Sequence, residues 1–151
     1  MGAFVTGRAE AVVDAAIEEN TVYTRLVSLR MTSGQMLDVW DEHPLISRGM
    51  AIGESYQVII VMTRATVSVV DALPDAPQAD DRWQGVIVRT DWRAAREAYR
   101  HARPDLFAHE WALIDTPVGQ MLMQPADLPP RTGVGAHFRT LKARFELYAI
   151  V

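Results

Sequence analysis

The clearest pattern of apolar and polar positions lies at the end of the chain. Every second position there is apolar, namely Leu141, Ala143, Phe145, Leu147, Ala149 and Val151. The positions between them hold Thr140, Lys142, Arg144, Glu146 and Tyr148. Because successive side chains of a strand point to opposite faces, this alternation predicts an antiparallel strand. One face would lie on the core, and the other in water or against a partner.

The start of the chain shows a helical spacing instead. Its apolar residues are Ala9, Val12, Val13, Ala16 and Ile17. Acidic residues lie between them, so the pattern predicts a short amphipathic helix. Thr6 is expected to cap the start of this helix and Asn20 to end it.

A second helix is predicted over Trp92–Arg103, capped by Asp91 and ended before Pro104. Its arginines are spaced three, four and three residues apart: Arg93, Arg96, Arg100 and Arg103. On a helix this spacing would align them along one face. Two interpretations remain open. The face is solvated, with arginine stems covering the sheet, or it grips phosphates, an acidic partner or the acidic linker of a neighbouring copy.

The rest of the chain is rich in predicted strands. They cover residues 22–31, 35–41, 55–70, 83–89, 107–115 and 120–124. Val58–Met62 is apolar throughout, as expected for a strand that is covered on both faces. Residues 55–70 are long for one strand, so we expect a bend or hairpin near Thr63-Arg64. Residues 42–53 and 125–135 are predicted to be loops suited to contacting neighbours.

A repeated tetrapeptide suggests internal duplication. Gly34-Gln35-Met36-Leu37 returns as Gly119-Gln120-Met121-Leu122. We therefore expect an α+β fold, with two short helices on a mainly antiparallel sheet or half-barrel and a possible repeat of helix-strand-strand-strand. Residues 1–151 would form a single domain. Its possible halves, 1–70 and 83–151, would be joined by the acidic linker 71–82.

Composition narrows the class of protein. The chain has 151 residues and a formal net charge of −4, which does not indicate a nucleic-acid-binding protein. It contains no cysteine, which excludes disulfides, thiolate metal sites and a cysteine nucleophile. The longest apolar run, Val58–Met62, is too short to span a membrane. No signal peptide is evident, so we expect a cytoplasmic or virion-associated location.

No catalytic constellation is evident in the sequence. The histidines His43, His101, His109 and His137 have no zinc-like spacing. A composite metal site of His109, His137 and a carboxylate is weighed against ordinary solvated histidines, which we favour. The paired carboxylates Glu18-Glu19, Asp41-Glu42 and Asp80-Asp81 lie where solvation explains them. We expect no enzyme, no cofactor and no metal.

Two partial resemblances accompany this interpretation. Trp83–Arg89, the second helix and the segment WALIDTPVGQ at residues 111–120 resemble one module of the vicinal oxygen chelate superfamily. That resemblance implies two strand–helix–three-strand modules around a ligand cleft. Since the first strands carry no metal-binding histidine, it favours the metal-free, drug-binding members over the lyases and dioxygenases. The β-rich first half also loosely resembles an OB barrel, although its N-terminal segment fits a helix better than that fold's first strand.

The function we expect is that of a non-catalytic structural or assembly subunit in a homo-oligomer, such as a phage-type ring or tube component. Its partners would be itself or other protein subunits. The candidate interaction surface comprises Arg93, Arg96, Arg100, Arg103, Lys142, Arg144 and Tyr148. If the acidic first helix met the arginine-striped second helix of a neighbour, their charges would suit each other. The alternatives are a metal-free small-molecule binder with a cleft between the halves and, more weakly, a single-stranded nucleic-acid-binding protein.

Overall fold

The structure is a computed structural model that describes residues 4–42, 46–63, 65–70, 82–141 and 143–151. These residues form an all-β fold with no α-helix, only short 3-10 turns. The strands are β1 (Val5–Glu18), β2 (Thr21–Met31), β3 (Met36–Glu42), β4 (Ser55–Thr63), β5 (Thr66–Val70), β6 (Arg82–Trp92), β7 (His101–Ala102), β8 (Trp111–Thr116), β9 (Gly119–Met123), β10 (His137–Leu141) and β11 (Arg144–Ile150). The prediction of an α+β class was therefore wrong.

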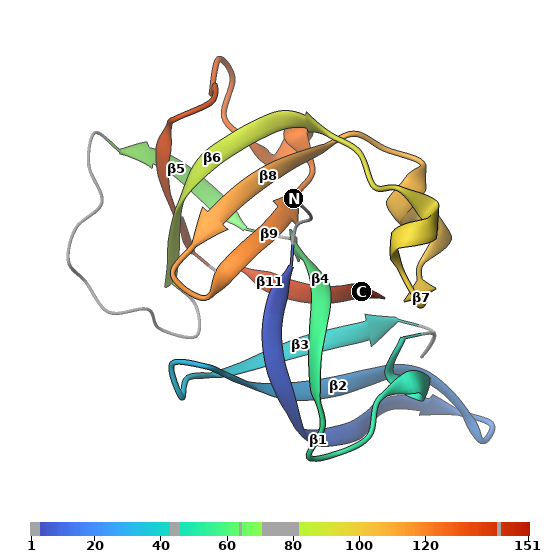
Figure 1. The fold of residues 1–151 in the computed structure, drawn as a ribbon. Coiled ribbons are helices and arrows are strands. Elements are labelled where there is room, and N and C mark those ends of the chain that lie inside the picture. The colour runs from blue at the N-terminus through green and yellow to red at the C-terminus, as the bar shows by residue number, and fades with distance from the viewer. Residues whose placement is uncertain (1–3, 43–45, 64, 71–81, 142) are drawn as a thin grey trace.

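Five strands close a first barrel, which is the lower part of the molecule in Figure 1. β1 pairs with β2 on one side and β4 on the other, and β2 pairs with β3. The ring is completed by β11, which pairs in parallel with β3 and antiparallel with β4. A five-stranded closed barrel of this kind is similar to an OB barrel. The N-terminal segment is its first strand.

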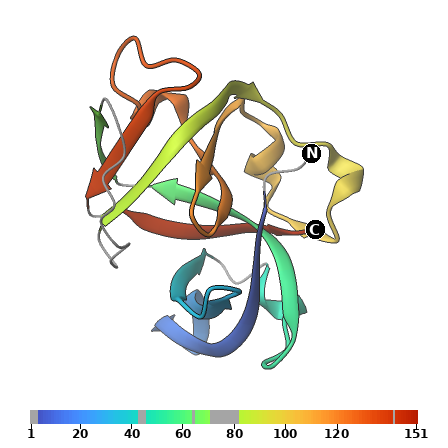
Figure 2. The ribbon, with the colours of Figure 1, turned by 60° about the vertical axis from the view of Figure 1, so that its left-hand side comes forward.

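A second barrel uses strands from later in the chain. β6 pairs with β8 and β10, and β8 pairs with β9. β9 then pairs in parallel with β4, and β10 pairs antiparallel with β5. β4 and β5 together thus occupy the position in the second barrel that β11 occupies in the first (Figure 2).

The two barrels are joined by one long antiparallel ribbon. Thr63 pairs with Arg144 and Thr66 pairs with Leu141, in the same register. β4–β5 and β10–β11 therefore run along each other from one barrel into the other. The expected break near Thr63-Arg64 is present as the end of β4, but the chain continues along the same partner strands rather than folding back in a hairpin. Arg64 itself lies outside the described residues.

The middle of this ribbon explains the apolar run in the sequence. Val58, Ile60 and Met62 belong to one core cluster, whereas Ile59 and Val61 belong to another. All five side chains are at most 1% exposed. The prediction that Val58–Met62 is covered on both faces is confirmed, because apolar cores lie on both sides of the strand.

The first predicted helix is strand β1. Its pairing with β2 shifts register between Ala9 and Ala11 and twice between Asp14 and Ile17. Each bulge displaces the inward-facing positions by one residue. Val13 and Ile17 also occupy exposed positions, so the apolar residues of this strand do not follow a simple alternation of inward and outward positions. The strand ends at Glu18, and Glu19 and Asn20 turn the chain into β2 with positive φ angles of 49° and 64°. The signal interpreted as a helix stop therefore belongs to a hairpin turn.

The second predicted helix is also absent. β6 extends through Trp92, and the chain then follows an irregular path with two short turns, Arg96–Ala98 and Pro104–Phe107, around the short strand β7. The β7 strand and the segment around it are tied to β11 by main-chain hydrogen bonds, from Arg100 N to Ile150 O (2.9 Å) and from Arg103 N to Tyr148 O (2.8 Å). These tertiary bonds hold the segment extended and replace helical ones. The strand–helix module of the vicinal oxygen chelate resemblance does not form.

The final strand follows its predicted alternation only in part. Phe145 and Leu147 are buried and Glu146 is half-buried, but Tyr148 is only 5% exposed. The register with β4 shifts between Leu147 and Ala149. Tyr148 therefore points inward and packs in the second core cluster, together with Ile59 and Val61. Thr140 is also buried, and Lys142 lies outside the described residues. The expectation that Tyr148 faces water or a partner was therefore wrong.

The repeated tetrapeptide occupies matching places in the two barrels. Gly34 lies between β2 and β3, and Gly119 opens β9 directly after β8. Both glycines have positive φ angles, 88° and 136°, which favour glycine in a tight turn. In each barrel the tetrapeptide thus lies in the hairpin formed by the second and third strands, which are β2 and β3 in the first barrel and β8 and β9 in the second. The division into halves 1–70 and 83–151 stays a prediction, and residues 71–81 of the linker lie outside the described part.

Candidate functional site

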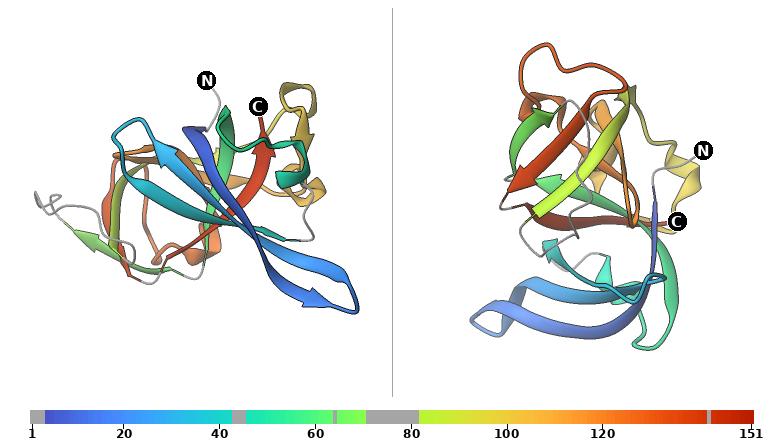
Figure 3. Two further views of the ribbon diagram at one scale, coloured as in Figure 1. Left: turned by 90° about the horizontal axis from the view of Figure 1, so that it is seen from below. Right: turned by 90° about the vertical axis from the view of Figure 1, so that its left-hand side faces the viewer.

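The outer part of the β1–β2 hairpin extends away from the barrels (Figure 3). β4 pairs with β1 only over Val5–Arg8, and β3 pairs with β2 only from Thr24 onward. Residues 11–23, which we call the arm, therefore form mainly a two-stranded ribbon. Ribbons of two strands are only marginally stable in isolation, so an arm of this length gains stability from a surface that covers it.

The arm carries exposed apolar side chains at its centre. Val13 is 56% exposed and Ile17 is 59% exposed. At the tip, Glu18 and Glu19 are exposed and make no ion pair with any described residue. Asp14, by contrast, is paired with Arg25 at 2.8 Å. The arm thus combines uncovered apolar area with two acidic groups that make no ion pair within the described part of the chain.

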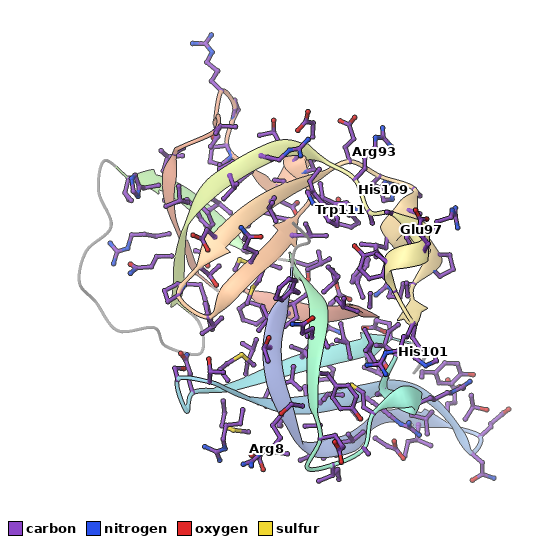
Figure 4. All side chains as sticks on the ribbon, in the orientation of Figure 1. Arg8, Arg93, Glu97, His101, His109 and Trp111 are labelled. Atoms are coloured by element: carbon purple, nitrogen blue, oxygen red, sulfur yellow. The ribbon has the colours of Figure 1, made fainter. Side chains whose placement is uncertain are left out.

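The segment between β6 and β8 forms a second projection, residues 93–110, which we call the lobe (Figure 4). Its anchor is Leu106, which is fully buried and whose carbonyl oxygen accepts a hydrogen bond from Trp111 Nε1 at 2.9 Å. On its surface, the rings of Tyr99 and Phe107 lie 6.1 Å apart and are half-buried. The lobe and the arm each connect the first and second strands of their barrels, so they hold equivalent positions in the fold.

The structure brings two of the predicted surface residues together. The guanidinium of Arg103 lies 4.0 Å from the ring centre of Tyr148, and it is held by Asp105 at 2.8 Å and Glu146 at 3.9 Å. Trp111 packs edge-on against Tyr148. Burial raises the pKa of Tyr148 to about 12, although Arg103 opposes this shift. This arrangement fixes the base of the lobe on β11 and leaves Arg103 little freedom to bind a partner.

The other predicted arginines are separated from one another. Arg93 pairs with Glu110 at 3.1 Å. Arg96 lies over the ring of Phe107 at 4.7 Å, and Arg100 donates from Nε to the main-chain oxygen of Val151 at 3.4 Å. The three do not form the stripe that a helix would have produced. Arg96 and Arg100 are nevertheless exposed and make no ion pair with a carboxylate of the described residues.

Arg144 belongs to a different site, between the barrels. Its guanidinium lies 4.5 Å from the centre of the Trp40 ring and bonds to Glu42 at 2.5 Å. Beside it is a pocket of about 400 Å³. The lining residues are Leu26, Met36, Leu37, Asp38, Trp40, Trp83, Ala143, Arg144 and Phe145. These residues come from β2 and β3 of the first barrel, from β6 of the second and from the ribbon that joins them.

One residue that lines the pocket, Trp83, has a buried donor without an acceptor. The side chain of Trp83 packs edge-on against Phe145 with ring centres 4.9 Å apart, and its Nε1 has no hydrogen-bond partner among the described residues. A buried unpaired N–H group costs about 1–3 kcal/mol. The sequence offered no signal for this pocket, because Trp40 and Trp83 are far apart in the chain.

Asp41 corrects a further expectation. Its carboxylate is fully buried rather than solvated. It accepts hydrogen bonds from the main-chain N–H groups of Ser47 at 2.7 Å and Ile46 at 3.2 Å. Asp41 therefore holds the residues that follow β3 in place. Its position at the end of an apolar strand, followed by a loop, is compatible with this role but does not specify it.

The described residues contain no cluster of three potential metal ligands. His109 packs edge-on against Trp111, with ring centres 5.8 Å apart, and is exposed. No helix among the described residues is long and apolar enough to cross a membrane. The expectation that the protein is not an enzyme stays a prediction.

Comparison with known proteins assigns no family to this chain. None of the protein-family models matches the sequence. No curated protein matches it significantly either. The function must therefore be argued from the arm, the lobe and the pocket.

Proposed function

We propose that the protein is a non-catalytic subunit that assembles with protein partners through its arm. The observation that carries this proposal is the uncovered ribbon itself, with Val13 and Ile17 more than half exposed. Fully covering an exposed aliphatic side chain contributes about 1.5–3 kcal/mol. Two such side chains on an otherwise marginal ribbon provide exposed apolar area that a partner surface can cover.

The first experiment measures mass in solution as a function of concentration. We expect the wild-type protein to form oligomers, and we expect Ile17→Asp to shift it towards the monomer. Val134→Asp serves as a matched control, because Val134 is 68% exposed in the loop before β10. A wild-type protein that stays monomeric at high concentration, and binds no other protein through the arm, would contradict the proposal.

A second candidate function is favoured by the pocket between the barrels. Its volume of about 400 Å³ falls within the range of small-molecule sites. Trp40, Trp83 and Arg144 would suit a flat ligand that carries a hydrogen-bond acceptor. Thermal-shift screening tests this function, since a ligand specific for the folded state raises the melting temperature. A genuine hit should be lost in Met36→Trp, which would fill the pocket.

A further inference from the structure

We propose that the partner of the arm is the lobe of a second copy of this chain. The inference rests on the proposed function and names the surface that receives the arm. The lobe combines a half-buried aromatic pair, Tyr99 and Phe107, with the exposed cations Arg96 and Arg100. The arm offers groups that complement these. They are the exposed aliphatic side chains of Val13 and Ile17 and the acidic side chains of Glu18 and Glu19.

Charge complementarity supports this pairing. The arm, residues 11–23, contains three acidic residues and no Lys or Arg, a formal charge of −3. The lobe, residues 93–110, contains four arginines and three acidic residues, a formal charge of +1, and all four arginines lie within residues 93–103. Like charges would keep two arms or two lobes apart, whereas arm and lobe attract.

Two acidic groups of the arm and two arginines of the lobe remain unpaired within one copy. Glu10 and Asp14 already have arginine partners in the same chain, and Arg93 and Arg103 already have carboxylate partners. Among the described residues, Glu18 and Glu19 of the arm and Arg96 and Arg100 of the lobe have no oppositely charged side chain as a partner. Two new pairs between copies would satisfy all four, although Glu97 is also unpaired and reduces the attraction.

The symmetry of the assembly follows from how the arms are exchanged. If two copies each place an arm on the other's lobe, the contact is reciprocal and closes as a dimer. If each copy passes its arm to the next, the contact is head-to-tail and forms a ring or a chain. Both outcomes use the same arm–lobe contact, and the measured mass tells them apart.

Charge reversal on one side at a time provides the test. We expect Glu18→Arg/Glu19→Arg and Arg96→Glu/Arg100→Glu each to weaken self-association at least about tenfold. When the two variants are mixed in equal amounts, the complementary charges are restored, and association should return. Arg139→Glu is the matched control for a reversed exposed charge, because Arg139 is exposed on β10. Circular dichroism establishes that each variant is folded.

The outcomes separate this inference from the proposed function. Loss of assembly in each variant and its recovery in the mixture support the arm–lobe contact. If the wild type assembles but neither variant changes its mass, the arm–lobe contact is refuted while the assembly function stands. If the wild type is monomeric but binds another protein through its arm, only the arm–lobe contact is refuted. If it is monomeric and binds no other protein through the arm, both fail. Binding of a fluorescent single-stranded oligonucleotide that needs Arg96 and Arg100 would assign the lobe to nucleic acid and overturn the inference.

Discussion

Replacing Asp41 should reveal how strongly one buried carboxylate holds the first barrel to the residues that follow it. The side chain is fully buried and accepts main-chain hydrogen bonds from Ser47 at 2.7 Å and Ile46 at 3.2 Å. A hydrogen bond to a charged group contributes about 1.5–3 kcal/mol. Asp41→Ala removes two of them and leaves both N–H groups buried. We expect the free energy of unfolding to fall by about 3–5 kcal/mol.

Asp41→Asn should cost less, about 1–2 kcal/mol, because both bonds end on Oδ2, and an amide oxygen in its place can accept both without carrying the charge. The assay is equilibrium denaturation in urea, with the midpoint and slope compared between variants. Asp38→Ala is the control. Asp38 also accepts a hydrogen bond, from Ser28 Oγ at 2.7 Å, but it is exposed, so its loss should cost less than about 1 kcal/mol.

Two results would refute this reasoning. If Asp41→Ala stays within about 1 kcal/mol of the wild type, the main-chain hydrogen bonds do not stabilise the fold as the geometry indicates. If Asp41→Asn is as damaging as Asp41→Ala, the oxygen that Asn retains is not the relevant acceptor, and the effect must come from the loss of charge.

Two further predictions concern packing and pH. A Cβ atom on Gly85 would lie 2.6 Å from the Asp115 carbonyl oxygen. Gly85→Ala should therefore lower the free energy of unfolding by about 2–3 kcal/mol, as measured by urea denaturation. Gly133→Ala is the control and should change it little, because Gly133 has open space around it. Burial raises the pKa of Tyr148 to about 12 from about 10 when unfolded. The free energy of unfolding that the neutral Tyr148 side chain contributes is therefore fully present below pH 10 and is lost as the pH rises towards 12. Alkaline denaturation should show a decline of roughly 2 kcal/mol that is smaller in Tyr148→Phe; equal declines would contradict this.

The candidate site could be predicted from the sequence only as a list of charged residues. Arg96 and Arg100 are exposed, as a surface role requires, but the alignment of all four arginines depended on a helix that does not form. Arg103 and Tyr148 do meet, yet they meet at the base of the lobe, where both are largely buried. Whether a side chain is exposed or paired depends on which segments of the fold lie opposite it. The local sequence pattern does not contain that information.

The sequence by itself determined those strands and turns whose pattern of apolar residues and glycines is compatible with only one local structure. The apolar run Val58–Met62 required cover on both faces, and the glycines of the repeated tetrapeptide required tight turns between strands. Residues 22–31 and 35–41 were likewise predicted close to the observed β2 and β3. In each case, the side-chain period or the backbone freedom of glycine is a local property, so no distant contact was needed.

Only the tertiary structure decided between helix and strand for residues 5–18 and 92–103. β1 has register shifts and carries the apolar residues Val13 and Ile17 at exposed positions, so it lacks the alternation of a half-buried strand, and it is stabilised by hydrogen bonds to β2 and β4 rather than within itself. Bonds from the lobe to β11 likewise outweigh the helical preference of its sequence. Strand pairing joins residues that are distant in the chain. For β1 this energy appears once β2 and β4 have paired with it, and for the lobe once β11 lies beside it.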